Sequence, residues 1–149
     1  MKWIKMFMLW IWQIPQNYIA FFICGVLGPL CTYGGIYNNK SLIISNNILS
    51  NFSLGDYIFI KPNTPEKGIR HELGHSYQSQ LLGWFYIPVI AIPSITHNIV
   101  HSIISKFGKA WNYYSFYTEK WADKLSESEK IAKIASHYFN SLQEIQKFI

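Results

Sequence analysis

The sequence predicts a mainly α-helical domain with a small β-hairpin, associated with a membrane. Three observations support this fold class. Hydrophobic residues make up 50% of the chain and charged residues only 14%, which is unusual for a soluble domain. Long apolar stretches open the chain and follow its centre. Between them lies a polar helical pattern with two histidines four residues apart. For 149 residues we expect one domain, 1–149.

The N-terminal segment, residues 1–33, is the first predicted membrane segment. It contains no Lys, Arg, Asp, Glu or His after Lys5, and it is long enough for a bilayer span of about 20 residues. A polar break at residues 13–17 permits either one kinked span or a short interfacial helix followed by a second helix. A cleaved signal peptide is the rival interpretation, but no small-residue cleavage site is evident.

Residues 41–61 are predicted to form the β-hairpin. The runs 41–45 and 54–60 are rich in β-branched and aromatic residues, and asparagine and serine separate them. In the second run, Tyr57 and Phe59 share one face, while Ile58 and Ile60 share the other. Such a hairpin could bind the backbone of a substrate or simply cover the helix that follows, and the residues leave both open.

Residues 64–83 are predicted to form a helix. Thr64 is the expected N-cap, Pro65 the first helical residue, and the helix is expected to end near Gly83. Gly74 costs about 1 kcal/mol relative to alanine in a helix interior. Its presence indicates that another chain segment or a substrate passes close to the helix at this point.

This helix carries an H-E-x-x-H motif. His71 and His75 are four residues apart and lie on one helix face, so both imidazoles can bind a single cation. Glu72 follows about 100° further round the helix, beside the metal rather than on it. The pattern is typical of zinc hydrolases in which the glutamate is the general base. A polar helix turn that binds no metal is the alternative.

A catalytic zinc site needs a third protein ligand, and the best candidates lie in a second predicted helix, 111–124. Glu119 and Asp123 are again four residues apart on one face of this helix. One carboxylate can complete the zinc site. The other can accept the N–H of a ligating histidine, which fixes the orientation of the ring.

The H-E-x-x-H motif at 71–75 followed by E-x-x-A-D at 119–123 resembles the gluzincin metallopeptidases. It is closest in pattern to the membrane-embedded CAAX-prenyl protease and heat-shock protease X group. The resemblance implies a zincin-like helical domain that binds one zinc ion through His71, His75 and Glu119, with Asp123 orienting a ligand. It implies hydrolysis of peptide bonds through a zinc-activated water, with Glu72 as general base. The stretch 71–83 also resembles small uncharacterised bacterial membrane proteins bearing H-E-x-G-H.

Residues 84–105 are predicted to form an apolar membrane hairpin or re-entrant segment. The stretch contains no Lys, Arg, Asp or Glu. A straight helix of about 24 residues would carry the chain roughly 36 Å and leave Glu119 across a bilayer from His71. We therefore expect the chain to turn back at Pro88 and Pro93.

An oxyanion that develops during hydrolysis needs a stabilising side chain, and the sequence does not choose among its candidates. They are His97, His101, Tyr113, Tyr114 and Tyr117. The two histidines are also four residues apart, but no carboxylate partner lies nearby in the sequence. We expect them to line a pocket or to be structural rather than to bind a second metal.

The C-terminal residues 126–149 predict an amphipathic helix that packs on the core. A capping box opens the segment, and apolar residues then recur at helical spacing.

The formal charge of +5 could indicate a nucleic-acid partner, but the Lys and Arg residues are spread singly without a basic stripe. Anionic lipid headgroups explain the charge better. The expected partners are therefore a peptide or protein substrate and the lipid bilayer, at the bacterial cell membrane, and no nucleic acid. Two alternatives to a peptidase are a non-catalytic, zinc-stabilised membrane module and a metal-free membrane interaction protein.

Overall fold

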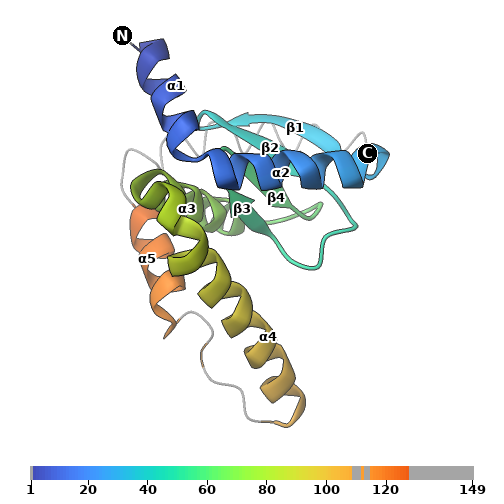
Figure 1. The fold of residues 1–149 in the computed structure, drawn as a ribbon. Coiled ribbons are helices and arrows are strands. Elements are labelled where there is room, and N and C mark those ends of the chain that lie inside the picture. The colour runs from blue at the N-terminus through green and yellow to red at the C-terminus, as the bar shows by residue number, and fades with distance from the viewer. Residues whose placement is uncertain (1, 109–111, 113–114, 128–149) are drawn as a thin grey trace.

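The computed structural model describes residues 2–108, 112 and 115–127 of the chain. It is mostly helical with a small four-stranded mixed sheet, as the composition and patterning predicted in outline (Figure 1). The elements in chain order are α1 (Lys2–Trp12), α2 (Ile14–Leu27), β1 (Thr32–Tyr37), β2 (Lys40–Ile44), β3 (Phe52–Leu54), β4 (Tyr57–Ile60), α3 (Glu66–Leu82), α4 (Ile92–Lys106) and α5 (Tyr117–Ser126).

The predicted N-terminal membrane segment forms two helices rather than one kinked helix. α1 ends at Trp12, and α2 begins at Ile14 with a proline in its first turn, where the missing N–H costs nothing. The polar residues of the break have a packing role. Gln13, Gln16 and Asn17 are buried, whereas the aromatic side chains of α2 are exposed.

The strands at the centre of the expected hairpin, 41–61, do not pair as a hairpin. The sheet order is β1-β2-β4-β3, and β2 and β4 are parallel, with Ile43 opposite Phe59. A turn at Gly55, which has a positive φ of 60°, interrupts the second predicted strand, 54–60, and joins β3 to β4 as an antiparallel hairpin. The first hairpin joins β1 to β2 through Asn38 and Asn39, both with positive φ, which matches the backbone of a tight hairpin turn.

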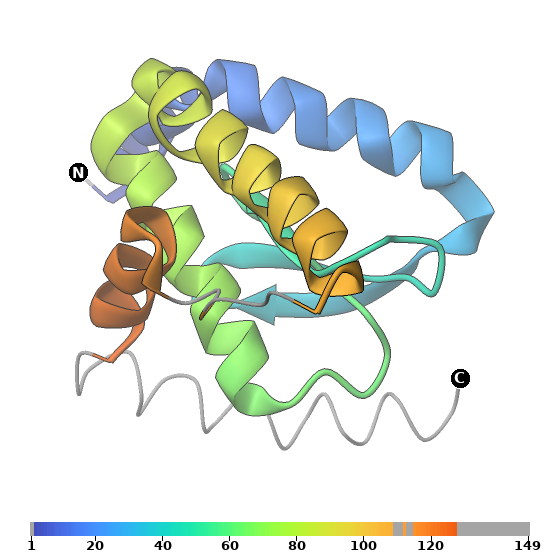
Figure 2. The same ribbon diagram turned by 90° about the horizontal axis from the view of Figure 1, so that it is seen from below.

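The sheet is covered by a helix on each face, as Figure 2 shows for α2 and α3. Ile43 and Phe59 pack with α2 on one face. Ile58 and Ile60 pack with Ile69 and Leu73 of α3 on the other. The predicted alternation of residues 57–60 is therefore confirmed, and it places α3 against the sheet.

Helix α3 begins one step later than predicted. Pro65 occupies the N-cap position, and no side chain caps the helix there. The hydroxyl of Thr64 donates instead to the carbonyl of Lys61, at 2.7 Å, so it stabilises the turn before the helix. The end of α3 is as predicted, with Gly83 as its C-cap at a positive φ of 53°.

The predicted reversal at Pro88 and Pro93 is wrong. A π-helical turn, Ile87–Ala91, runs directly into α4, and each proline lies in the first turn of its segment. There a proline needs no N–H partner, and the wider π-helical geometry carries the backbone past the ring. The chain therefore turns back only after Lys106, and Glu119 returns to the site on α5.

Helix α5 begins at Tyr117 rather than at residue 111, because Phe116 has an extended backbone. It packs against α3 where the sequence predicted a close approach. A Cβ at Gly74 would lie only 2.1 Å from the carbonyl oxygen of Ala122, so only glycine fits. The predicted C-terminal helix, 126–149, lies outside the described residues beyond Glu127.

Candidate metal centre

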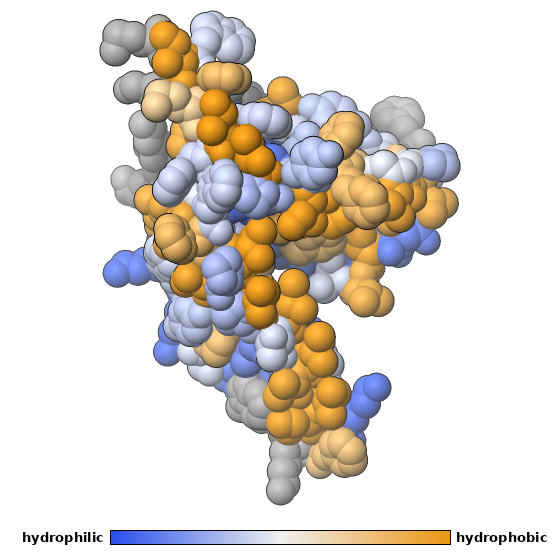
Figure 3. Space-filling model, viewed as in Figure 1, coloured by the Kyte–Doolittle hydropathy of each residue, from blue (hydrophilic) through white to orange (hydrophobic). Residues whose placement is uncertain are grey.

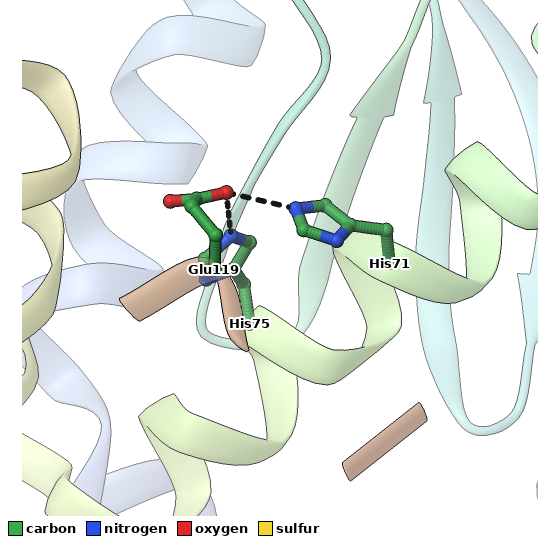
Figure 4. Close-up of side chains that lie close together, drawn as sticks. All are labelled: His71, His75 and Glu119. Atoms are coloured by element: carbon green, nitrogen blue, oxygen red, sulfur yellow. Dashed lines mark hydrogen bonds and ion pairs between the residues drawn. The ribbon is translucent and has the colours of Figure 1, made fainter. Parts of the chain in front are cut away.

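Three side chains from two helices converge at one point (Figure 4). Nε2 of His71 lies 3.0 Å from Oε2 of Glu119, and Nε2 of His75 lies 3.4 Å from the same oxygen. α3 supplies the histidines from one face, and α5 supplies the glutamate. The structure thus brings together three residues that are separated by up to 48 positions in the sequence.

These distances fit a bound cation. Two ligand atoms that are each about 2.0–2.1 Å from zinc and subtend a tetrahedral angle lie roughly 3.3 Å apart. The two distances from Glu119 to the histidines bracket that value, and all three ligand atoms lie within 4.8 Å of one another. Zinc could therefore be held here without a large movement of the backbone.

The two oxygens of Glu119 have different environments. Oε1 accepts hydrogen bonds from the hydroxyls of Ser94, at 2.7 Å, and Thr118, at 2.9 Å. Oε2 faces the two imidazoles alone. Burial by itself would raise the pKa of this carboxyl group, but the histidine contacts and the Ser94 hydrogen bond lower it well below its usual value. Glu119 is therefore anionic, with one oxygen fixed and the other directed at the site.

Each histidine is oriented through its other ring nitrogen. Nδ1 of His71 lies 2.7 Å from Oδ1 of Asp123, and Nδ1 of His75 lies 2.7 Å from Oε1 of Gln78. The amide of Gln78 is fixed in turn, because its Nε2 donates to the carbonyl of Thr118 at 2.8 Å. Oxygen acceptors at both Nδ1 atoms favour the tautomer that leaves Nε2 free to ligate a metal.

The electrostatics of the cluster favour a cation. Burial alone would lower the pKa of His71, but contacts with Glu119 and Asp123 and the charge of Glu72 raise it to about 9. Burial also opposes protonation of His75, yet its hydrogen bond with Glu119 and the charge of Glu72 raise its pKa as well. The metal-free cluster consequently holds protons where a metal ion would otherwise provide positive charge.

Glu72 lies beside the three candidate ligands and lines the same cavity. It is 6% exposed, and its Oε2 has no hydrogen-bond partner among the described residues. Burial raises the pKa of its carboxyl group, with the charges of both histidines opposing the change. A buried carboxylate with a free oxygen and a raised pKa is suited to accept and return a proton.

A cavity of about 720 Å³ adjoins the cluster. Its polar end is formed by His71, Glu72, His75 and Glu119, and its other walls are mainly apolar residues of α2, of the edge strand β3 and of the helical segment from Ile87 onward. Tyr86 also lines it and is buried, and its hydroxyl donates to the carbonyl of Ser53 at 3.2 Å. A chain segment could therefore lie beside the candidate ligands.

The three oxyanion candidates that the structure describes, His97, His101 and Tyr117, do not line the cavity. The hydroxyl of Tyr117 donates to the carbonyl of Val89 at 2.6 Å. His97 stacks on Phe116 with ring centroids 4.3 Å apart, and neither His97 nor His101 lines the cavity. Tyr113 and Tyr114 lie outside the described residues.

Sequence reasoning missed four residues of the site. Gln78, three residues after His75 on the same helix face, could have been found from its spacing. Thr118 stands next to a predicted ligand but has no pattern of its own. Ser94 and Tyr86 carry no signal in the sequence, because their positions depend on how the segment after α3 returns over the sheet.

Comparisons with models of protein families, with curated proteins and with solved structures find no match for this chain.

Proposed function

We propose that this protein is a zinc-dependent metallopeptidase that acts at a membrane. The observation that carries the proposal is the convergence of His71, His75 and one oxygen of Glu119, with the free carboxylate oxygen of Glu72 beside them. Three ligands that leave a position open, together with a neighbouring base, are the requirements of hydrolytic zinc chemistry.

In this proposal the residues of the chain divide the chemical work. Zinc, when bound, supplies a Lewis acid that polarises a carbonyl and lowers the pKa of water. Glu72 takes the proton of the attacking water and returns it to the leaving amine, because its carboxylate lies beside the ligands with one oxygen that has no hydrogen-bond partner among the described residues. Asp123 and Gln78 hold the two imidazoles in position, and Ser94 and Thr118 hold the carboxylate of Glu119.

The burial pattern of α2 and the exposure of α4 support the membrane part of the proposal. On α2 the polar residues Gln16 and Asn17 face inward, whereas Phe21 and Phe22 face outward. α4 has no buried residue, and the helical segment Ile87–Lys106 is long and apolar enough to cross a bilayer.

The decisive experiment measures the zinc content of the detergent-purified protein. We expect one zinc ion per chain in the wild type and loss of zinc in His75→Ala and Glu119→Ala. His101→Ala is the matched control and should retain zinc, because His101 lies outside the site. Zinc that is retained in Glu119→Ala would disprove the proposed ligand set.

A zinc-stabilised module without catalysis is the second candidate. It is favoured by the packing of α5 on α3, because Glu119 connects both histidines to Ser94 and would hold three helices around a metal. Peptide hydrolysis decides between the two candidates. A zinc-loaded wild type that cleaves no peptide while it loses thermal stability on chelation would support the structural role.

A further inference from the structure

The rim of the cavity beside the metal centre is exposed and mainly apolar, with Ser50 as its exposed polar member. Ile19 of α2, Leu49 in the 45–51 loop, and Ile92 and Ile95 near the start of α4 all line the cavity, and all are exposed to solvent. Leu49 is extreme, because 99% of its surface is accessible. A residue that both lines a cavity and is exposed lies at its mouth, so these residues mark the opening.

The same rim joins larger apolar surfaces on both sides. Exposed aromatic residues of α2 lie beyond Ile19, and exposed aliphatic residues of α4 continue from Ile95 toward Ile103. Figure 3 shows apolar side chains gathered over α2 and along α4. Apolar surface on this scale is uncommon on soluble monomers and marks a site of contact with a membrane or with another protein.

Charge is confined to the closed end of the cavity. Among the described residues that line it, the only Asp, Glu, His, Lys or Arg side chains are those of His71, Glu72, His75 and Glu119. The buried polar side chains at the start of α2 are satisfied inside the protein, since Ser79 donates to Gln13 and the backbone N–H of Asp56 donates to Asn17. The α2 residues that line the cavity are all apolar, namely Ile19, Ile23 and Leu27.

We infer that the cavity opens into the hydrocarbon layer of the bilayer and takes an apolar peptide segment that lies in the membrane. This inference rests on the proposed peptidase function and names its substrate class. A soluble peptide would have to lose its hydration in order to pass Leu49 and Ile95, whereas a segment already in lipid loses none. The edge strand β3, which lines the cavity, can then offer backbone hydrogen-bonding groups that lipid cannot provide.

The position of the mouth can be measured without any substrate. In a variant with Cys24 and Cys31 replaced by alanine, a fluorophore is attached to Leu49→Cys, Ile95→Cys or, as a control, Lys124→Cys on α5. The protein is placed in vesicles of phosphatidylethanolamine and phosphatidylglycerol. We expect lipids with an acyl-chain quencher to quench the first two probes and aqueous iodide to quench the third. Iodide quenching at Leu49 and Ile95, or protein that does not bind the vesicles, would overturn the inference.

The substrate class is tested with one fluorogenic apolar peptide in two forms, free in solution or attached to a single-pass helix in the same vesicles. We expect the anchored form to be cleaved at least about tenfold faster, and Leu49→Asn to slow only its cleavage. Leu81→Asn is the matched control, because Leu81 is exposed but does not line the cavity. Equal rates for both forms would overturn the inference and leave the peptidase standing. If zinc-loaded protein cleaves neither form, both the proposed function and its substrate class are overturned. The position of the cavity mouth is then still decided by the quenching experiment, which needs no substrate.

Discussion

The two halves of this molecule differ in the side chains that they bury and expose. Around α3 and the sheet, aliphatic residues such as Leu73 and Ile58 form the core, and polar side chains gather at the candidate metal centre. In α1, α2 and α4, aromatic and aliphatic residues are exposed, and the polar residues of α2 are buried. The first pattern suits a surround of water and the second a surround of lipid. This contrast is the basis for the proposal that the protein carries a hydrolytic site on a lipid-facing scaffold.

The sharpest test of the candidate metal centre is Glu72→Gln. Amide replaces carboxylate in the same space, so zinc should be retained while peptide hydrolysis falls by about 10²–10⁴-fold, the usual contribution of a general base. Glu66→Gln, on the first turn of the same helix, should change neither quantity, because Glu66 only approaches Arg70 at 4.0 Å. Full hydrolysis by Glu72→Gln would exclude the role assigned to this residue.

The pH dependence of stability should differ in sign between metal-free and zinc-loaded protein. The pKa of His71 is about 9 in the metal-free fold and about 6.5 when unfolded. Its contribution is therefore complete below pH 6.5 and is lost as pH rises through 9, up to about 3 kcal/mol. In zinc-loaded protein stability should rise over the same range, because protons no longer compete with the metal.

Chemical unfolding between pH 6.5 and 9, with zinc or with a chelator, measures these slopes. His71→Gln should reduce the slope of the metal-free protein, because it removes one of the two histidines whose pKa is raised in the folded state. Parallel slopes with and without zinc would show that protons and zinc do not compete for the same histidines.

Asn17→Leu tests whether the buried polar face of α2 stabilises the fold. Oδ1 of Asn17 accepts the backbone N–H of Asp56 at 2.8 Å, and its loss leaves that donor without this acceptor. We expect a loss of about 1–3 kcal/mol in the free energy of unfolding, measured by denaturation in detergent. Asn46→Leu, at an exposed loop position, is the control. A stabilised Asn17→Leu would mean that the inward polar face is incidental.

The smallest effect should come from the outward face of the same helix. Phe22→Ser should weaken binding to lipid vesicles roughly tenfold, because less apolar surface is buried, and should leave the stability in detergent unchanged within about 0.5 kcal/mol. Ala20→Ser, on the buried face, should lower the stability in detergent and leave vesicle binding unchanged. Vesicle flotation and denaturation measure the two quantities, and the same response to both substitutions would remove the distinction between the faces.

The candidate ligands could be predicted because each pair is local. His71 with His75 and Glu119 with Asp123 lie four residues apart, and helical geometry alone places each pair on one face. Gly74 carried a tertiary prediction as well, since a glycine inside a helix has a cost that close packing explains.

The features of the fold that could not be predicted depend on contacts between segments distant in the sequence. The parallel pairing of β2 and β4 requires a connection that crosses the sheet, which no residue in 45–51 specifies. The predicted reversal at Pro88 and Pro93 was wrong because it assumed that a proline ends a helix, whereas here a π-helical turn accommodates the backbone. Gln13 and Asn17 resembled an interruption until the partners that bury them were known.

The close approach of Gly74 to the backbone of Ala122 also determines the spacing of the candidate ligand atoms. It fixes how closely α5 can approach α3, and so fixes the gap between Glu119 and the two imidazoles. That gap suits a tetrahedral ion with bonds of about 2 Å. Two of the three candidate ligand atoms are imidazole nitrogens, which disfavour calcium because calcium takes six to eight oxygen ligands.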